Sequence, residues 1–190
     1  MTAALSNPND YIFLHEQLLS HASTDAIHQE MMQLYEKKEL QSNRNEYTDH
    51  CFGIGNLPST LAVEAEITKV ISDQYGALGK IVFSNTYARI YLADSYLKVH
   101  VDRPGLDITL SANIFMSEGV SWPFYYTTAA YNPAWDKLAY LPDSDDTHGV
   151  DLKPGQGACI LGTKTAHWRK PIHCKPNDYI VQCFWHWSIV

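Results

Sequence analysis

The 190-residue chain has little positive charge and no long hydrophobic run. Its 14 Lys and Arg residues stand against 21 Asp and Glu residues, which gives a formal net charge of −7. Proteins that bind nucleic acid or anionic membranes usually carry a basic face, so we expect neither partner. No apolar stretch approaches the roughly eighteen residues needed to cross a bilayer, and no basic start followed by an apolar run suggests a signal peptide. We therefore expect a soluble, unsecreted, cytoplasmic protein.

Paired cysteines and nucleotide-binding glycine fingerprints are also missing. The four cysteines form no Cys-x-x-Cys motif. Some of them lie in apolar runs, where a thiol behaves as a small hydrophobe, so we expect them to be reduced. Gly53-x-Gly55 has neither the preceding strand nor the full glycine pattern of a phosphate-binding loop, and Pro58 follows it closely. The sequence also has no internal repeat and no low-complexity tract.

A content of 45% hydrophobic and 12% aromatic residues is enough for one packed domain over residues 1–190. We expect helical support from residues 1–79 and a β core from residues 80–190. Apolar side chains at helical spacing predict helices near 11–19, 23–39 and 59–79. Residues 41–49 are polar and predict a loop, and residues 52–58 predict a turn-rich connector.

From Lys80 onward, short β-branched and aromatic runs alternate with Gly, Pro, Asn and Asp. The expected strands are 80–84, 86–93, 96–101, 107–116, 122–128, 137–141, 157–161, 165–169 and 179–189. The acidic segment Asp143–Gly149 predicts a loop. Because no long helical pattern separates the strands, we expect an antiparallel sandwich or jelly roll supported by about three helices.

A candidate metal site begins at His100 and Asp102, which are two residues apart on an expected strand and therefore share a face. His167 is the best second histidine, because it follows a predicted turn and a buried strand that return the chain to the core. The competitors are His148, in the acidic segment, and His173, beyond Pro171. Two histidines and one carboxylate leave three octahedral positions open, which is typical of non-haem Fe(II) oxygenases. Zinc with the same ligands would give a hydrolytic alternative.

The order of these motifs resembles the Fe(II)/2-oxoglutarate-dependent oxygenases, specifically their small prolyl-hydroxylase-like branch. The resemblance covers roughly residues 86–187. It rests on His100-x-Asp102, on Leu-Lys-Pro-Gly-Gln-Gly at 152–157, and on Gly-Thr-x-x-x-His ending at His167. It implies a double-stranded β-helix that uses Fe(II), 2-oxoglutarate and O₂. The implied reaction is hydroxylation of a C–H bond with release of succinate and CO₂.

The co-substrate of such an enzyme needs a cation for its distal carboxylate, and a guanidinium group suits that role. The family's basic residue, nine or ten positions past the distal histidine, is replaced here by Pro176, Asn177 and Asp178. Arg169 shares a face with His167 and is the predicted substitute, with Lys175 as runner-up.

Two further side chains near the expected metal ligands have predicted roles. Tyr91 matches the position of a tyrosine that hydrogen-bonds the oxoacid in similar enzymes. Arg103 follows Asp102 and is expected to point away from the metal, near the substrate entrance.

The substrate is expected to be a small molecule or a peptide residue, either an amino acid or a prolyl group. The segment Ser117–Gly149 is the expected lid, with Trp135 and Tyr140 close to acidic residues that would suit an amine or a basic peptide. The alternative function is a cupin-like metal-binding or sensing module without turnover. The sequence leaves the oligomeric state open.

Overall fold

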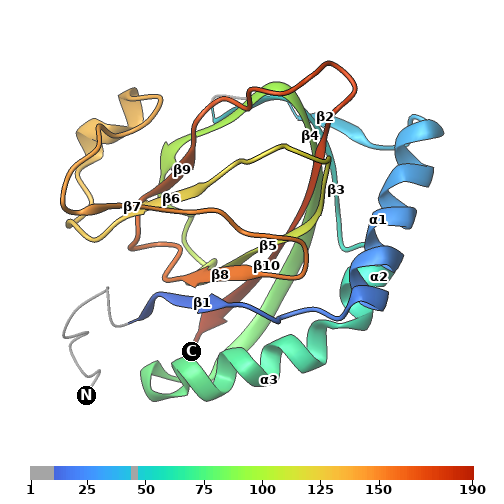
Figure 1. Cartoon of the computed structure of the whole chain (residues 1–190). Helices are drawn as coiled ribbons and strands as arrows, with labels where there is room; N and C mark the ends of the chain where they lie inside the picture. The colour runs from blue at the N-terminus through green and yellow to red at the C-terminus, as the bar shows by residue number, and fades with distance from the viewer. Residues whose placement is uncertain (1–10, 44–46) are drawn as a thin grey trace.

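A curled antiparallel sheet forms the body of the molecule (Figure 1), and the computed structural model describes residues 11–43 and 47–190. The helices are α1 (His21–Glu36), α2 (Pro58–Ala62) and α3 (Glu64–Tyr75), with short 3-10 turns at Gly76–Leu78 and Pro133–Lys137. The strands are β1 (Phe13–His15), β2 (Gln41–Asn43), β3 (Thr48–Gly55), β4 (Ile81–His100), β5 (Ile108–Met116), β6 (Phe124–Thr127), β7 (Thr147–Val150), β8 (Gly157–Ile160), β9 (His167–Arg169) and β10 (Ile180–Ile189). Among these residues, no helix has the length and apolar character to span a membrane.

The sheet runs in the order β1-β8-β5-β10-β4-β9-β6-β7, with the β2–β3 hairpin also paired to β4. β4 connects the two walls of the half-barrel, because its first part pairs with β10 and its last residues pair with β9. Asp94, at φ 64°, and a register shift in the pairing with β3 allow the strand to bend between these parts. The prediction of a mainly β jelly roll with three supporting helices is confirmed.

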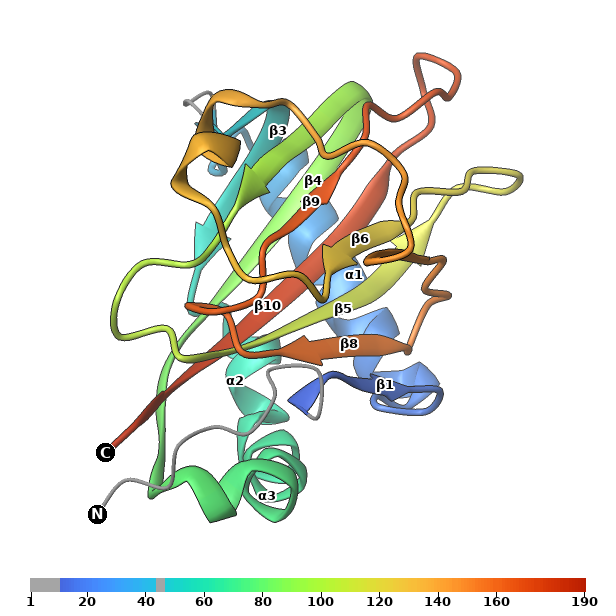
Figure 2. The ribbon, with the colours of Figure 1, turned by 90° about the vertical axis from the view of Figure 1, so that its left-hand side faces the viewer.

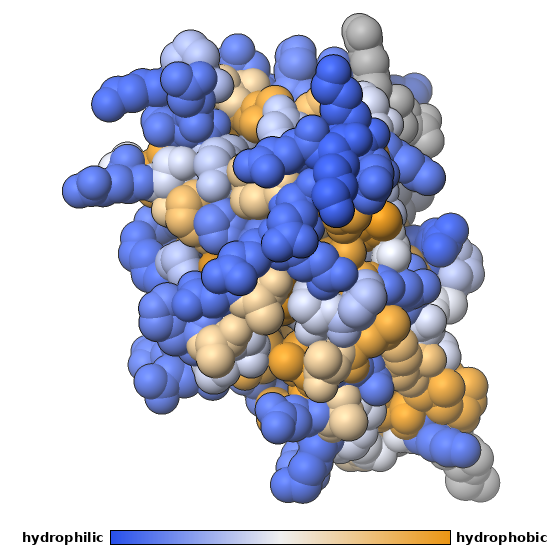
Figure 3. All heavy atoms as spheres, turned by 90° about the vertical axis from the view of Figure 1, so that its right-hand side faces the viewer, coloured by the Kyte–Doolittle hydropathy of each residue, from blue (hydrophilic) through white to orange (hydrophobic). Residues whose placement is uncertain are grey.

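The helices cover the convex face of the sheet, as Figure 2 shows with α1 behind β10 and β5. Ile27, Met31 and Ile71 on the helices pack against Trp185 and Trp187 of β10 in the largest core cluster. The Trp185 indole N–H donates to the carbonyl of Thr60, so the helical layer is hydrogen-bonded to the sheet as well as packed on it. The outer surface on the α1 side is largely hydrophilic, with smaller hydrophobic areas between (Figure 3).

The helix predictions are partly right. The helix expected at 23–39 is α1, but it starts at His21 because the Ser20 side chain caps it by accepting from the Ser23 N–H. The helix expected at 59–79 is divided into α2 and α3 at Val63. The helix expected at 11–19 is wrong, because β1 pairs with β8 there. Sheet hydrogen bonds satisfy that backbone, so tertiary pairing outweighs the helical spacing of its apolar residues.

Several strand predictions also need correction. The stretches 80–84, 86–93 and 96–101 are parts of the single strand β4. Residues 137–141 form no strand: Lys137 ends the 3-10 turn Pro133–Lys137, and the residues after it have no regular structure. The acidic segment contains β7, which pairs with β6. Residues 41–58 contribute β2 and β3 instead of a loop and a connector, although residues 44–46 of the expected loop lie outside the described part.

Candidate metal centre

His100, Asp102 and His167 come together at one end of the barrel. His100 ends β4, His167 begins β9, and the two residues are direct partners in the pairing of these strands. Asp102 lies just beyond β4, where its backbone N–H donates to the Gly162 carbonyl at 2.8 Å. Among the described residues, these three form the one cluster of His, Cys, Asp or Glu with ligand atoms close enough to hold a metal ion.

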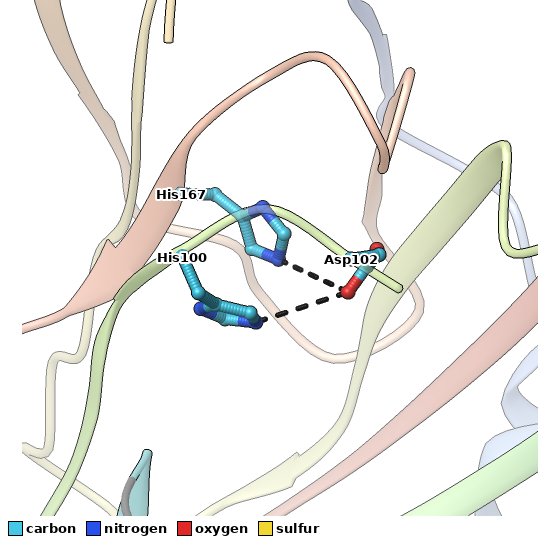
Figure 4. Close-up of side chains that lie close together, drawn as sticks. All are labelled: His100, Asp102 and His167. Atoms are coloured by element: carbon cyan, nitrogen blue, oxygen red, sulfur yellow. Dashed lines mark ion pairs between the residues drawn. The ribbon is translucent and has the colours of Figure 1, made fainter. Parts of the chain in front are cut away.

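The three side chains point toward one another (Figure 4). Oδ1 of Asp102 is 3.8 Å from Nε2 of His100 and 3.9 Å from Nε2 of His167. Metal–ligand bonds to His and Asp are about 2.0–2.2 Å, so ligand atoms at these separations leave room for one ion between them. The two imidazoles and the single carboxylate oxygen form one face of a coordination sphere and leave its other positions open.

Both histidines are oriented by hydrogen bonds from the ring nitrogen opposite the centre. Nδ1 of His100 is 2.8 Å from the Lys98 carbonyl, and Nδ1 of His167 is 3.0 Å from the Thr165 carbonyl. A carbonyl only accepts, so each Nδ1 carries the proton and each Nε2 presents its lone pair to the centre. Burial, followed by the proximity of His167, lowers the pKa of His100 to about 4, which keeps this ligand neutral.

The Asp102 carboxylate is fixed on its other oxygen. Thr109 Oγ1 donates to Oδ2 at 2.5 Å and leaves Oδ1 for a metal. Burial alone would raise the pKa of Asp102, but the neighbouring His167 and His100 and the Thr109 hydroxyl outweigh it, so the pKa lies below its ordinary value. Gly162 packs against this carboxylate, where a Cβ would overlap Oδ2 of Asp102 and meet Thr109 Oγ1 at 2.6 Å. The site therefore has a ligand set and a surrounding shell that fit a divalent cation.

The triad lines a cavity of about 350 Å³, a size typical of small-ligand sites. Its remaining polar lining includes Asn43, Tyr87, Arg89 and His186, and Phe184 adds an aromatic wall. Asp102 is its one carboxylate among the described residues. With that carboxylate committed to a metal, the rest of the cavity suits an anionic ligand.

Arg169 points into the barrel but does not line this cavity. It is 1% exposed, and its Nη1 donates to the Trp122 carbonyl at 2.5 Å. Nη2 is 3.4 Å from Ser111 Oγ, and the Gln182 amide, with its oxygen turned toward the guanidinium, accepts at 2.7 Å. Burial lowers the pKa of Arg169 to about 10, so it stays charged at neutral pH.

The other predicted residues lie outside the triad. Tyr91 is fully buried, and its hydroxyl accepts from Nη1 of Arg89 at 3.3 Å. Arg103 is exposed and lines the cavity mouth, whereas Lys175 is exposed in the loop before β10. His148 on β7 and His173 are also exposed, and neither joins the described triad.

Sequence reasoning missed Arg89, Thr109 and Gly162. The alternation along β4 carried a signal for Arg89, because it lies two residues from Tyr91 and therefore on the same face. Thr109 and Gly162 had no such signal, since each acts on Asp102 through a contact made only in the folded chain.

No family model and no curated protein sequence matches the chain. Its structure is similar to a Pseudomonas putida prolyl-4-hydroxylase, with a TM-score of 0.69, 13% identity and coverage of 95% of this chain and 93% of that one. A viral collagen prolyl hydroxylase of Paramecium bursaria Chlorella virus-1, solved with 2-oxoglutarate, gives a TM-score of 0.61, 14% identity and coverage of 94% and 97%. HygX of Streptomyces hygroscopicus, solved with nickel and 2-oxoglutarate, gives a TM-score of 0.64 and 10% identity, with coverage of 96% of this chain and 84% of that one.

The fold is therefore that of the Fe(II)/2-oxoglutarate oxygenases. The predicted resemblance to their prolyl-hydroxylase-like branch is confirmed as a likeness of fold.

Proposed function

We propose that the chain is an Fe(II)- and 2-oxoglutarate-dependent oxygenase with His100, Asp102 and His167 as the metal ligands. The observation that carries this proposal is that two Nε2 atoms and one free carboxylate oxygen face a common centre on the wall of a cavity. When bound, Fe(II) with 2-oxoglutarate and O₂ supplies the oxidant for hydroxylation, and succinate and CO₂ are the co-products.

The protein's own contribution is to prepare the ligands and shape the cavity. The Lys98 and Thr165 carbonyls hold the protons on the two Nδ1 atoms, and Thr109 keeps Asp102 turned toward the centre. Phe184 and Leu97 line the wall and limit the water around the reacting group. Ligands held in this way need little rearrangement when a metal binds.

The substrate of the proposed reaction is a small molecule or a peptide residue, an amino acid or prolyl group. Exposed Arg103 at the cavity mouth supports a substrate with a carboxylate. The acidic residues of the expected lid give no support to an amine, because Asp143 pairs with Lys170 at 3.1 Å and none of these residues lines the cavity. Nucleic acid and membranes are not proposed as partners, in keeping with the net charge of −7. A cytoplasmic setting accords with the four free cysteines.

Anaerobic addition of Fe(II) and 2-oxoglutarate tests the cofactor set. We expect the weak visible charge-transfer absorption of the chelate, followed in air by succinate formation that increases with substrate. A cupin-like binding module or a zinc hydrolase would show neither signal. A screen over amino acids and peptides, read by mass spectrometry for a gain of one oxygen, then tests the substrate class.

Asp102→Ala tests the ligand assignment. Loss of a ligand should weaken Fe(II) binding by at least about a hundredfold, since changes outside the ligand set already cost about ten- to a hundredfold. His148→Ala, on the exposed strand β7, is the control and should keep its affinity. Equal affinity for Asp102→Ala and the wild type, measured by calorimetry, would show that the ligands lie elsewhere.

A further inference from the structure

Among the residues that the structure describes, two arginines, Arg89 and Arg169, place their guanidinium groups in the barrel interior, and they differ in what they contact. Neither Arg89 nor Arg169 lies within 4.0 Å of a carboxylate among the residues that the structure describes. A charge taken out of water without an opposite charge is costly unless its hydrogen bonds are satisfied or a ligand supplies the countercharge. The two side chains meet this requirement differently.

Arg169 is satisfied by the protein. Trp122 and Ser111 accept from it, and Gln182 offers its amide oxygen. The guanidinium carbon also lies 4.8 Å from the ring centre of Trp122 and 5.3 Å from that of Phe124. These contacts account for its burial without any ligand. Its position outside the cavity lining agrees with a structural role.

Arg89 has donors left over. Its Nε donates to Asn43 Oδ1 at 3.2 Å and its Nη1 to the Tyr91 hydroxyl at 3.3 Å. A guanidinium carries five N–H groups, so the remaining ones have no acceptor within the described part of the protein. Arg89 is partly exposed and lines the same cavity as His100, Asp102 and His167.

The surroundings hold Arg89 in place. Asn43 Oδ1 also accepts from the Tyr87 hydroxyl at 3.1 Å, so a single amide oxygen fixes both side chains. Asn43 fits there because Gly53, the direct partner of Arg89 on β3, has no side chain. A Cβ at Gly53 would meet Asn43 Oδ1 and the Tyr87 ring, each at 2.6 Å. The rings of Tyr87 and Phe184 lie 5.0 Å and 5.8 Å from the guanidinium carbon. This is a fixed cation with free donors, as recognition of a carboxylate requires.

We propose that Arg89, rather than Arg169, binds the distal carboxylate of 2-oxoglutarate. This inference rests on the proposed function, in which the oxoacid end of the same molecule meets the metal. The co-substrate would lie along the cavity between the triad and Arg89, against the apolar wall of Leu97 and Phe184. The anchor then comes from the strand that carries His100 and not from the strand after the distal histidine, which accords with the missing basic residue at 176–178.

The contact between Arg89 and the distal carboxylate can be tested by comparing the binding of 2-oxoglutarate with that of 2-oxopentanoate. 2-Oxopentanoate has the oxoacid and the five-carbon chain of 2-oxoglutarate but no distal carboxylate. Both ligands are titrated anaerobically into the Fe(II)-loaded wild type, Arg89→Gln and Arg89→Lys, with the charge-transfer band and calorimetry as readouts. We expect Arg89→Gln to weaken 2-oxoglutarate binding by about ten- to a hundredfold and to leave 2-oxopentanoate binding unchanged. Arg89→Lys should recover part of the loss, because it restores the charge without the paired donors.

Lys175→Gln is the matched charge control, because it removes a positive charge from an exposed side chain outside the cavity. It should keep the wild-type affinity for both ligands. The proposal is overturned if Arg89→Gln keeps its 2-oxoglutarate affinity, if it loses both ligands equally, or if Lys175→Gln is the variant that loses 2-oxoglutarate. A wild type that binds Fe(II) but not 2-oxoglutarate would instead refute the co-substrate in the proposed function.

Discussion

The two faces of β10 differ in what their side chains do. Cys183, Trp185 and Trp187 point to the convex side and are fully buried beneath the helices. Phe184 and His186 alternate with them and line the cavity on the concave side. Adjacent residues of one strand thus serve stability and ligand binding separately, because side chains alternate across a sheet.

The difference is one of solvation as well as position. The convex face is a continuous apolar core, in which the few polar atoms, such as the indole N–H groups of Trp185 and Trp187, donate to the helices. The concave face carries polar groups, among them Asp102, Arg89 and His186, that line the cavity. Substitutions on the convex face should therefore change the free energy of unfolding, and those on the concave face should mainly change binding.

Trp185→Ala has the largest expected effect and tests whether the convex face of β10 carries the stability. It removes a fully buried indole and leaves the Thr60 carbonyl without its donor, so we expect a loss of about 3–5 kcal/mol in the free energy of unfolding. Phe184→Ala, one residue away on the partly exposed cavity wall, should cost only about 1–2 kcal/mol. Urea unfolding of both variants measures the difference. Equal losses would mean that the two faces share the stabilisation.

The fold class was predictable because it depends on local patterns. Period-two alternation and frequent turn residues after Lys80 predicted an antiparallel β core, and the structure confirms this. Several of the errors fall where strand pairing with a distant segment decides the outcome. β1 needs β8, and the β2–β3 hairpin needs β4, so neither could be recognised from its own residues. The length of β4 depends on a bend at Asp94 that looks like a strand end in the sequence.

The candidate site divides in the same way. Strand spacing placed His100 near Asp102, and the turn before β8 indicated His167, so the triad was available from the sequence. The sequence did not show which arginine faces the cavity. Arg169 shares a face with His167, but it makes its contacts with Trp122 and Ser111 across the barrel. Strand alternation predicts which face of the sheet a side chain is on. It does not predict whether that side chain reaches the open cavity or packs against other protein groups.

Gly162→Ala tests the concave side by adding a methyl group beside the Asp102 carboxylate. The added methyl group would overlap Oδ2 of Asp102 and meet the backbone oxygen of Leu106 at 2.7 Å, so the carboxylate must move. We expect a loss of about 1–3 kcal/mol in unfolding free energy, together with weaker Fe(II) binding. Gly76→Ala is the control, because Gly76 follows α3 with helical dihedrals and, among the described residues, an added Cβ would meet nothing within 4 Å beyond its chain neighbours and its own helix backbone. It should leave stability unchanged or raise it by up to about 1 kcal/mol, with no effect on metal affinity.

Thr109→Val has the smallest expected effect on metal binding, because it removes one hydroxyl with almost no change in the shape of the side chain. Thr109 Oγ1 is the donor that holds Oδ2 of Asp102, so Fe(II) affinity should fall by about tenfold. The hydroxyl is also one of the groups that lower the pKa of Asp102, so its removal should raise that pKa. Protons compete with the metal for this carboxylate, and metal binding in the variant should therefore begin to weaken at a higher pH than in the wild type.

Thr165→Val is the matched control for this change. Thr165 is also buried and lies two residues from His167, but its hydroxyl has no hydrogen-bond partner among the described residues. Removing an unsatisfied buried hydroxyl should leave metal affinity unchanged and should keep or raise the free energy of unfolding. Calorimetric titration of both variants with Fe(II) across a pH series separates the two outcomes. If Thr109→Val binds metal like Thr165→Val at every pH, the carboxylate does not need its hydroxyl donor, and the backbone contact with Gly162 alone positions Asp102.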